Sequence, residues 1–265
     1  EVFGYRVTYL PVDSTGKVSL KQVMDAVDED TAIVSIMYVN NESGAVNPIN
    51  EISEYVKKKT HAYMHVDLTQ SIGKVPLDMT NIDLASISAH KLEGLKGSGI
   101  LVKKSFVPYV PLINGGEQEF GIRGGTSNAL VDMMFAKTLR LALENGKKYH
   151  AYIQEMHDHL IAGLKSIEGV EINSPEDAIA STVNFSYENI PSEVMQNALN
   201  EGGFMVSARS TCDSKSMNPS YVLEAMGFSE KRASSCIRVS LSYHNTLEEV
   251  DRFIEVLKGV IQLYG

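Results

Sequence analysis

Residues 31–39 of the chain read TAIVSIMYV, residues 47–59 read NPINEISEYVKKK and residues 62–66 read AYMHV. The first segment is a continuous apolar run of strand length, the kind that is buried on both faces of a parallel sheet. The middle segment opens with a capping asparagine and a proline, repeats apolar residues at helical spacing and ends in three lysines, which suit the negative end of a helix dipole. Because the last segment is again a strand, the three together predict a βαβ unit.

The alternation of strands and helices continues on both sides of this unit. A strand is expected at residues 5–10, a helix opens at the capping box of Ser19 and Gln22, and further strands are expected at residues 84–88 and 99–103. This rhythm predicts an α/β fold with a mainly parallel, doubly wound sheet.

The second half of the chain is not expected to alternate strands and helices in the same way. A helical stretch at residues 128–167, interrupted near Asn145 and Gly146, leads into an α+β unit with strands at 181–186, 205–207 and 236–242, a helix at 192–200 and a last helix capped by Thr246 and Glu249. We therefore expect a large domain at residues 1–127, connecting helices at 128–168 and a small C-terminal domain at 169–265.

Composition excludes several classes of function. The 265 residues carry 24 Lys and Arg against 33 Asp and Glu, a formal net charge of −9, which argues against nucleic acid or an anionic membrane surface as the partner. No apolar run approaches the roughly 18 residues of a membrane span. The two cysteines, Cys212 and Cys236, cannot build a disulfide framework and indicate reduced thiols and a cytoplasmic location. The cysteines and histidines lack metal-ligand spacing, so no metal site is expected.

Two segments carry residues suited to covalent chemistry. Lys91 follows a buried strand in the stretch SISAHKLEGLKGSG, residues 86–99, where desolvation would lower the pKa of its amine and favour attack on an aldehyde. A surface lysine beside a tight turn is the alternative interpretation of this segment alone. Asp67 and Gln70 follow the neighbouring strand, and ligands in open α/β sheets bind at such strand ends. An anionic acceptor, an amide and an amine match a cofactor with a pyridinium nitrogen, a phenolic oxygen and an aldehyde.

At these residues the chain resembles the cysteine desulfurase branch of the class V aminotransferases, pyridoxal-phosphate (PLP) enzymes of fold type I. The likeness runs over essentially the whole chain and includes VNNESG (residues 39–44), HVDLTQ (65–70), SAHK (88–91), GIRGGT (121–126) and IRVSL (237–241). It implies a Schiff base on Lys91 and cofactor contacts from Asn41, Asp67, Gln70, Ser88, His90 and, across a homodimer interface, Thr126. It also implies that Asn41 and Arg238 bind the substrate carboxylate.

The resemblance implies an activity and partners as well. Cys212 matches the family's sulfur-accepting cysteine, so L-cysteine would leave its sulfur there as a persulfide and depart as L-alanine. A scaffold or thiolation protein would then accept the sulfur for iron–sulfur clusters or thiolated products. The sequence departs from the family at Arg209 and Thr211 before this cysteine and at Leu95 in the lysine loop. It is also expected to lack the family's N-terminal portion, about one small domain, which holds a phosphate loop and a ring stacked on the cofactor.

Three alternatives remain open from the residues. A selenocysteine lyase or a class V aminotransferase would share Lys91 and Asp67 without needing Cys212. A second alternative is a truncated or regulatory chain that has no activity. A nicotinamide-dependent dehydrogenase is the third, although no G-x-G-x-x-G follows the first strand.

Overall fold

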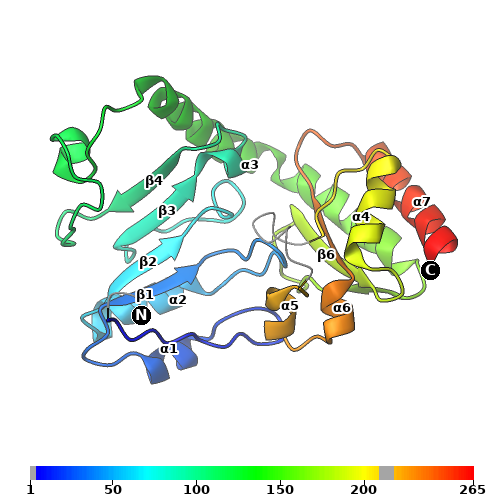
Figure 1. Cartoon of the computed structure of the whole chain (residues 1–265), viewed down its shortest axis with the longest axis horizontal. Helices are drawn as coiled ribbons and strands as arrows, with labels where there is room; N and C mark the ends of the chain where they lie inside the picture. The colour runs from blue at the N-terminus through cyan, green and yellow to red at the C-terminus, as the bar shows by residue number, and fades with distance from the viewer. Residues whose placement is uncertain (1–3, 209–217) are drawn as a thin grey trace. The chain divides into compact units, whose positions relative to one another are not determined.

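A computed structural model describes residues 4–208 and 218–265, and its elements divide into two compact units (Figure 1). We call Val27–Tyr38 with Ile49–Lys148 the four-strand unit. We call Glu1–Ala26, Val39–Pro48 and Tyr149–Gly265 the three-strand unit. The domain boundaries expected from the sequence stay a prediction. Among the described helices, none combines the length and the apolar character that crossing a membrane requires.

The four-strand unit contains a mixed sheet with the strand order β1-β2-β3-β4. Its elements are β1 (Ile33–Met37), α2 (Ile49–Lys59), β2 (Tyr63–Asp67), β3 (Leu84–Ser88), η1 (Ala89–Leu92), β4 (Gly99–Lys103), η2 (Gln118–Gly121) and most of α3 (Ala129–Lys165). The pairs β1–β2 and β2–β3 are parallel, which confirms the predicted βαβ unit and the α/β class.

The fourth strand differs from the expected doubly wound pattern. β4 pairs with β3 in the antiparallel sense, and the described strands follow one another across the sheet in chain order. Only residues 89–98 separate β3 from β4, and a parallel crossover needs a dozen or more residues. The short connection therefore forces a reversal of direction.

The two faces of this sheet differ in their burial. Residues of β1 alternate between exposed and buried, and α2 packs against β2 with Ile52 and Val56 buried. The buried face is formed by Val34, Ile36, Met64, Val66, Ala85 and Ile87. The opposite face, which includes Asp67 and Ser88, is exposed or half-buried. Burial of residues 31–39 on both faces, as expected from their apolar character, is therefore wrong for the described part of the chain.

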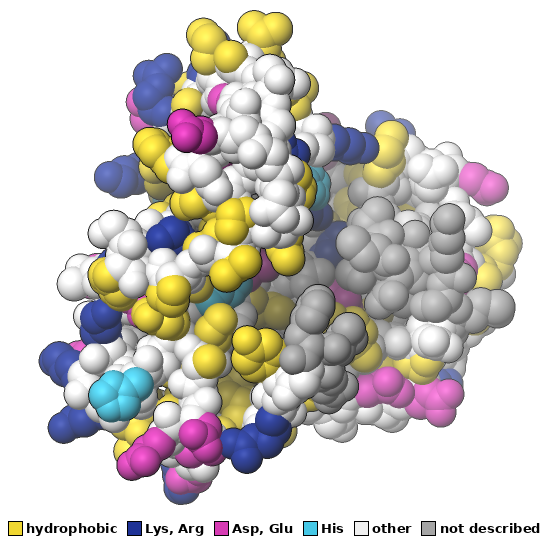
Figure 2. Space-filling model, turned by 60° about the vertical axis from the view of Figure 1, so that its left-hand side comes forward, with side chains coloured by type: hydrophobic (Ala, Val, Ile, Leu, Met, Phe, Trp, Pro, Cys, Tyr) yellow, Lys and Arg dark blue, Asp and Glu magenta, His cyan; other side chains and the backbone are white. Residues whose placement is uncertain are grey.

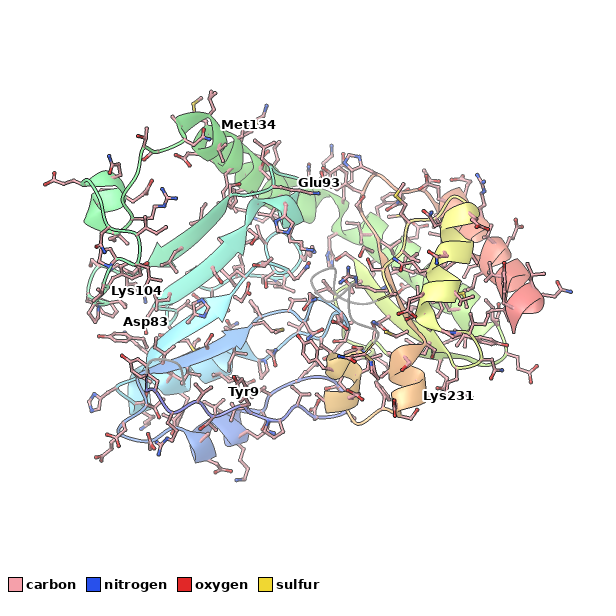
Figure 3. All side chains as sticks on the ribbon, in the orientation of Figure 1. Tyr9, Asp83, Glu93, Lys104, Met134 and Lys231 are labelled. Atoms are coloured by element: carbon pink, nitrogen blue, oxygen red, sulfur yellow. The ribbon has the colours of Figure 1, made fainter. Side chains whose placement is uncertain are left out.

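A buried carboxylate fixes the edge where β3 begins. The Asp83 carboxylate accepts a hydrogen bond from the backbone N–H of Met64 at 3.0 Å and forms an ion pair with Lys57 Nζ at 3.1 Å. Lys104 Nζ lies 4.0 Å from the same carboxylate (Figure 3). Because a buried charge is tolerated only when it is paired, this arrangement ties α2, β2 and β3 together. The packing lies at the amino ends of β2 and β3, opposite the strand ends that carry the candidate site.

Helix α3 runs without interruption through Asn145 and Gly146, contrary to the expected break. A Cβ atom built on Gly146 would lie 1.9 Å from the carbonyl oxygen of Gly73, and one on Gly73 would lie 2.3 Å from the carbonyl oxygen of Ala142. Glycine at residue 146 therefore permits close approach of two backbones rather than ending the helix.

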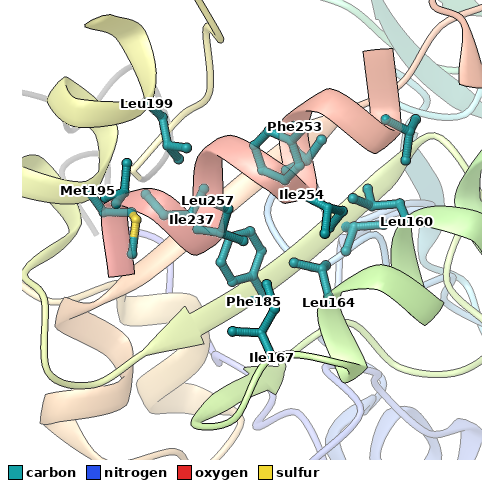
Figure 4. Close-up of a cluster of buried hydrophobic side chains, with 14 of the residues drawn as sticks. Leu160, Leu164, Ile167, Phe185, Met195, Leu199, Ile237, Phe253, Ile254 and Leu257 are labelled. Carbon is teal, nitrogen blue, oxygen red and sulfur yellow. The ribbon is translucent and has the colours of Figure 1, made fainter. Parts of the chain in front are cut away.

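The three-strand unit is an α+β body around an antiparallel sheet with the order β5-β6-β7. Its elements are α1 (Leu20–Ala26), β5 (Val170–Ile172), β6 (Thr182–Tyr187), α4 (Ser192–Glu201), α5 (Tyr221–Ala225), α6 (Glu230–Ser234), β7 (Cys236–Ser240) and α7 (Leu247–Tyr264), with the last turns of α3. Phe185 of β6 and Ile237 of β7 meet Phe253 and Leu257 of α7 in the core (Figure 4).

Both predicted capping boxes are confirmed, whereas two predicted strands are wrong. Thr246 and Glu249 exchange hydrogen bonds at the start of α7, and Ser19 and Gln22 do so before α1. Residues 4–10 form no strand, and Tyr9 is exposed (Figure 3). Residues 205–207 contribute only a single bridge between Ser207 and Arg238. Both segments have apolar, β-rich composition, yet propensity alone does not supply a pairing partner.

Candidate active site

Asp67 and Ser88 lie at the carboxyl ends of the neighbouring parallel strands β2 and β3. Both occupy the uncovered face of the sheet and are half-buried, while Val66 and Ile87 beside them point to the buried face. Carboxyl ends of parallel strands are the usual ligand sites of α/β sheets. The four-strand unit therefore presents a carboxylate and a hydroxyl on one accessible edge.

The segment after β2 orients its polar groups through local hydrogen bonds. Asp67 Oδ1 accepts from the backbone N–H of Thr69 at 2.8 Å, and Gln70 Oε1 accepts from Lys74 Nζ at 2.8 Å. Among the described residues, no further hydrogen bond involves the other carboxylate oxygen of Asp67 or the amide nitrogen of Gln70. The pair therefore offers one anionic acceptor and one amide donor.

Lys91 lies in η1, a tight turn that is closed at both ends. The backbone N–H of Ala89 donates to Ser98, the N–H of Gly94 donates to Ala89, and Glu93 adopts a left-handed backbone with a φ of 64°. Ala89 and Leu92 are buried, so the turn is anchored while Lys91 is half-buried and His90 is exposed. The turn therefore fixes the backbone of Lys91 just beyond the end of β3.

Thr126 lies on the exposed loop between η2 and α3. The described contacts do not join it to Asp67, Ser88 or Lys91. Its predicted role across a homodimer interface stays a prediction.

The remaining predicted side chains belong to the three-strand unit. Asn41 follows Asn40, whose Oδ1 accepts from the backbone N–H groups of Glu42 and Ser43 at 2.8 and 2.9 Å. The turn closes through Gly44, whose φ of +76° favours glycine and where a Cβ atom would lie 3.3 Å from the Thr182 carbonyl oxygen. This rigid turn holds Asn41, which is half-buried.

Arg238 extends from β7 toward the same turn and is 9 % exposed. Its Nη1 donates to the Asn41 carbonyl oxygen at 2.8 Å, and its Nη2 donates to Ser207 Oγ at 3.1 Å. The buried Nε has no hydrogen-bond partner among the described residues. Burial lowers the pKa of the Arg238 guanidinium, while the nearby Glu42 charge raises it. A buried guanidinium with an unused donor is suited to binding a carboxylate.

The sequence reasoning missed two buried polar residues beside Arg238. Glu42 is 2 % exposed, and its Oε2 accepts a hydrogen bond from Ser220 Oγ at 2.6 Å. The acid within the turn at residues 40–45, next to the apolar run of residues 31–39, was the available signal, because an acidic residue that is fully buried is almost always paired.

Of the two cysteines, Cys236 lies in the described part of the chain. Cys212 lies outside the described residues. Cys236 is fully buried in β7 and its Sγ donates to the Ala208 carbonyl oxygen at 3.2 Å, which confirms its interpretation as a core residue. No group of three or more potential metal-binding side chains occurs in the part of the chain that the structure describes.

An α/β unit with a lysine and an aspartate at adjacent strand ends, together with an α+β unit holding a buried arginine, defines a two-part α/β protein of the fold type I class. The chain belongs to the aminotransferase class-V family, whose model matches residues 1–253. It is 39 % identical over 262 residues to the cysteine desulfurase IscS of Methanosarcina thermophila, covering 98 % of this chain and 65 % of that protein. The chain thus spans just under two thirds of that relative's length.

Solved structures give the same assignment. A NifS-like protein superposes with a TM-score of 0.91 at 37 % identity, covering 99 % of this chain and 70 % of that one. SspA, solved in complex with cysteine, superposes with a TM-score of 0.74 at 31 % identity, covering 92 % of this chain and 69 % of that one. The fold class predicted from the sequence is therefore confirmed.

The residues of the four-strand unit fit PLP, the cofactor of this class of enzyme. They supply a carboxylate for a pyridine nitrogen (Asp67), an amide for a phenolic oxygen (Gln70), a hydroxyl and an imidazole for a phosphate (Ser88, His90) and an amine for an aldehyde (Lys91). All five lie at or just after the carboxyl ends of β2 and β3. Each polar group of the cofactor therefore has a residue of suitable chemistry, and the phosphate has two.

Proposed function

We propose that the protein is a PLP-dependent cysteine desulfurase that transfers sulfur from L-cysteine to Cys212 and releases L-alanine. The observation that carries the proposal is the set of Asp67, Ser88 and Lys91 at the ends of two adjacent parallel strands. The names of the relatives and the cysteine bound to SspA support the choice of substrate.

PLP, when bound, accepts electrons from the α-carbon of an amino acid. Asp67 would keep the pyridine nitrogen protonated, Gln70 would hydrogen-bond the ring oxygen, and Ser88 and His90 would contact the phosphate. Lys91, in the turn that follows β3, would be the attachment point for the aldehyde and also the base that takes the α-proton of the substrate. The hydrogen bonds of this turn fix the backbone from which the Lys91 side chain extends.

The substrate carboxylate is assigned to Arg238 and Asn41. Arg238 is buried, and two of its nitrogens are already fixed by Asn41 and Ser207. Its Nε is buried and has no hydrogen-bond partner among the described residues, so we assign this donor to a carboxylate oxygen of the substrate. A guanidinium held in this way binds a planar anion with little loss of side-chain entropy.

The sulfur step is assigned to Cys212. Its thiolate attacks the substrate sulfur, so that an S–S bond forms as the Cβ–S bond breaks, and Cβ keeps the electron pair and gains a proton. Cys212 carries a persulfide and the amino acid leaves as L-alanine. This assignment rests on the sequence match, because Cys212 precedes the segment that leads into α5.

A pair of cysteine variants tests the proposal. Cys212→Ala should abolish persulfide labelling and sulfur release yet keep the visible absorbance of bound PLP, and Cys236→Ala, at the buried thiol, should keep all three. Lys91→Ala should lose the absorbance. Normal sulfur release by Cys212→Ala would reject the desulfurase and favour a selenocysteine lyase or an aminotransferase. A wild-type chain that takes up no PLP would favour the inactive alternative.

We also propose that the active protein is a cytoplasmic homodimer that passes sulfur to an acceptor protein. Large apolar side chains are exposed on both sides of the Thr126 loop, among them Phe120, 99 % exposed, and Leu130, 75 % exposed. Hydrophobic side chains also gather on the surface of the four-strand unit that is turned to the viewer in Figure 2. Apolar patches of this kind mark interaction surfaces in soluble proteins.

A further inference from the structure

We propose that Glu42 is a positioning residue for substrate binding: its buried carboxylate holds the Asn41 turn, the guanidinium of Arg238 and the start of α5 in one polar network. The inference deepens the proposed function and rests on it. Glu42 would not touch the substrate but would act through Arg238, the group assigned to the substrate carboxylate.

Glu42 is held on three sides within the three-strand unit. Its backbone N–H donates to Asn40 Oδ1 at 2.8 Å, and its carbonyl oxygen accepts from Asn184 Nδ2 at 3.2 Å. Its side chain accepts from Ser220 Oγ at 2.6 Å, and Ser220 also caps α5 through the N–H of Leu223. The carboxylate therefore has little freedom to move.

The same network surrounds Arg238. Asn184 is the cross-strand partner of Arg238 in the β6–β7 ladder, and it is also the donor to Glu42. Arg238 in turn donates to the carbonyl oxygen of Asn41, the residue before Glu42. The acid and the arginine are thus tied to the same turn and the same ladder pair by separate hydrogen bonds.

The negative charge of Glu42 offsets the cost of burying the Arg238 guanidinium. Arg238 is buried, and a buried guanidinium is costly unless an anion lies near it. Burial lowers the pKa of Arg238 and Glu42 raises it, so the carboxylate favours the charged form of the arginine. Glu42 therefore favours the charged guanidinium, whose position is set by its hydrogen bonds to Asn41 and Ser207.

This role and its simplest rival predict opposite results for Glu42→Gln. If Glu42 were only an anion near the binding site, its removal would strengthen the binding of another carboxylate. If it positions Arg238, its removal weakens that binding. Glutamine keeps an oxygen that can accept from Ser220, so the substitution removes the charge with little change of shape.

The experiment compares L-alanine with L-alaninamide, which lacks the carboxylate, by calorimetric titration of the PLP-loaded protein. Glu42→Gln should raise the dissociation constant of L-alanine at least about tenfold, the scale of a lost charge-assisted hydrogen bond, and leave that of L-alaninamide unchanged. Glu201→Gln, at an exposed acid of α4, is the matched control and should change neither constant. Stronger or unchanged binding of L-alanine to Glu42→Gln would overturn the proposal.

A second measurement separates this inference from the proposed function. In the ligand-free protein, the Nε–H of Arg238 should exchange with solvent faster in Glu42→Gln than in wild type, as followed by nitrogen-15 NMR; an unchanged rate would overturn the positioning role. The dissociation constant of L-alanine should also be measured for Arg238→Gln by the same calorimetric titration. If it binds L-alanine as tightly as wild type, the assignment of Arg238 to the substrate fails, while the exchange rate still decides the role of Glu42.

Discussion

His65 links the stability of the four-strand unit to pH. It lies on the uncovered face of β2, its Nδ1 is 2.8 Å from Ser35 Oγ, and burial lowers its pKa, although the nearby Asp67 raises it. Because the folded state binds fewer protons than the unfolded state, the contribution of His65 to stability is fully present above the unfolded pKa of about 6.5 and is lost as the pH falls from there through the lower folded pKa.

We expect His65→Asn to flatten this dependence in urea unfolding between about pH 5 and pH 7. His61→Asn, at an exposed histidine between α2 and β2, is the control and should retain the wild-type slope. A slope that survives in His65→Asn would assign the pH dependence to another group.

At the scale of single residues, the sequence predicted local chemistry better than packing. Asp67 and Lys91 follow strands that could be recognised from apolar runs, so their place at the strand ends could be predicted. The network of Glu42, Arg238 and Ser220 could not, because it joins residues that are far apart in the chain. Nothing local in the sequence indicates which serine meets a buried acid.

Helix α3 depends on a backbone contact that only glycine allows. Alanine normally favours a helix interior over glycine by about 1 kcal/mol. At Gly146, however, the added Cβ would meet the Gly73 carbonyl oxygen, and backbone cannot move aside as a flexible side chain can. We therefore expect Gly146→Ala to lower the free energy of unfolding by about 1–3 kcal/mol.

Gly259 of α7 is the matched control, because a Cβ atom there meets nothing within 4 Å. Gly259→Ala should raise the free energy of unfolding by up to about 1 kcal/mol. Chemical denaturation of both variants checks the pair. Stabilisation by Gly146→Ala would mean that the close approach of α3 to Gly73 is not maintained.

The start of α7 offers a second prediction at the scale of elements. Thr246 Oγ1 accepts from the N–H of Glu249 at 3.2 Å, and the Glu249 carboxylate accepts from the N–H of Thr246 at 3.2 Å. Thr246→Ala should cost about 0.5–2 kcal/mol in thermal or urea unfolding, because it leaves a helix N–H without its partner. Thr246→Ser keeps the hydroxyl, and an equal loss in both variants would contradict the capping role.

Helices and strands could be predicted from the sequence where the pattern that defines them lies within a short segment. The capping boxes and the parallel pairs follow from adjacent residues and from the period of the apolar pattern. The direction of β4 follows from the length of its connection, and the continuity of α3 follows from a contact with Gly73, a residue distant in the chain. Since glycine serves both helix ends and close contacts, the sequence alone could not distinguish the two uses.

At the scale of the whole molecule, the exposed apolar residues near Thr126 are the basis of the proposed homodimer. Met133 and Met134 are exposed apolar side chains that follow Leu130 along the first turns of α3. Met134 is labelled in Figure 3. Stable interfaces bury about 800 Å² on each partner, with a core depleted of charge. A second copy of the chain would cover these residues and bring its own Thr126 to the cofactor, as the resemblance implies.

Leu130→Glu tests this arrangement, because it adds a charge to an exposed position and should leave the folded subunit intact. A charge buried in an apolar interface without a partner is costly, so we expect the variant to be monomeric in sedimentation equilibrium and to bind PLP more weakly than wild type. Leu263→Glu, at an equally exposed leucine of α7, should remain dimeric with wild-type affinity for PLP. If Leu130→Glu stays dimeric, the dimer interface lies elsewhere; if it is monomeric with unchanged affinity for PLP, Thr126 does not act across the interface.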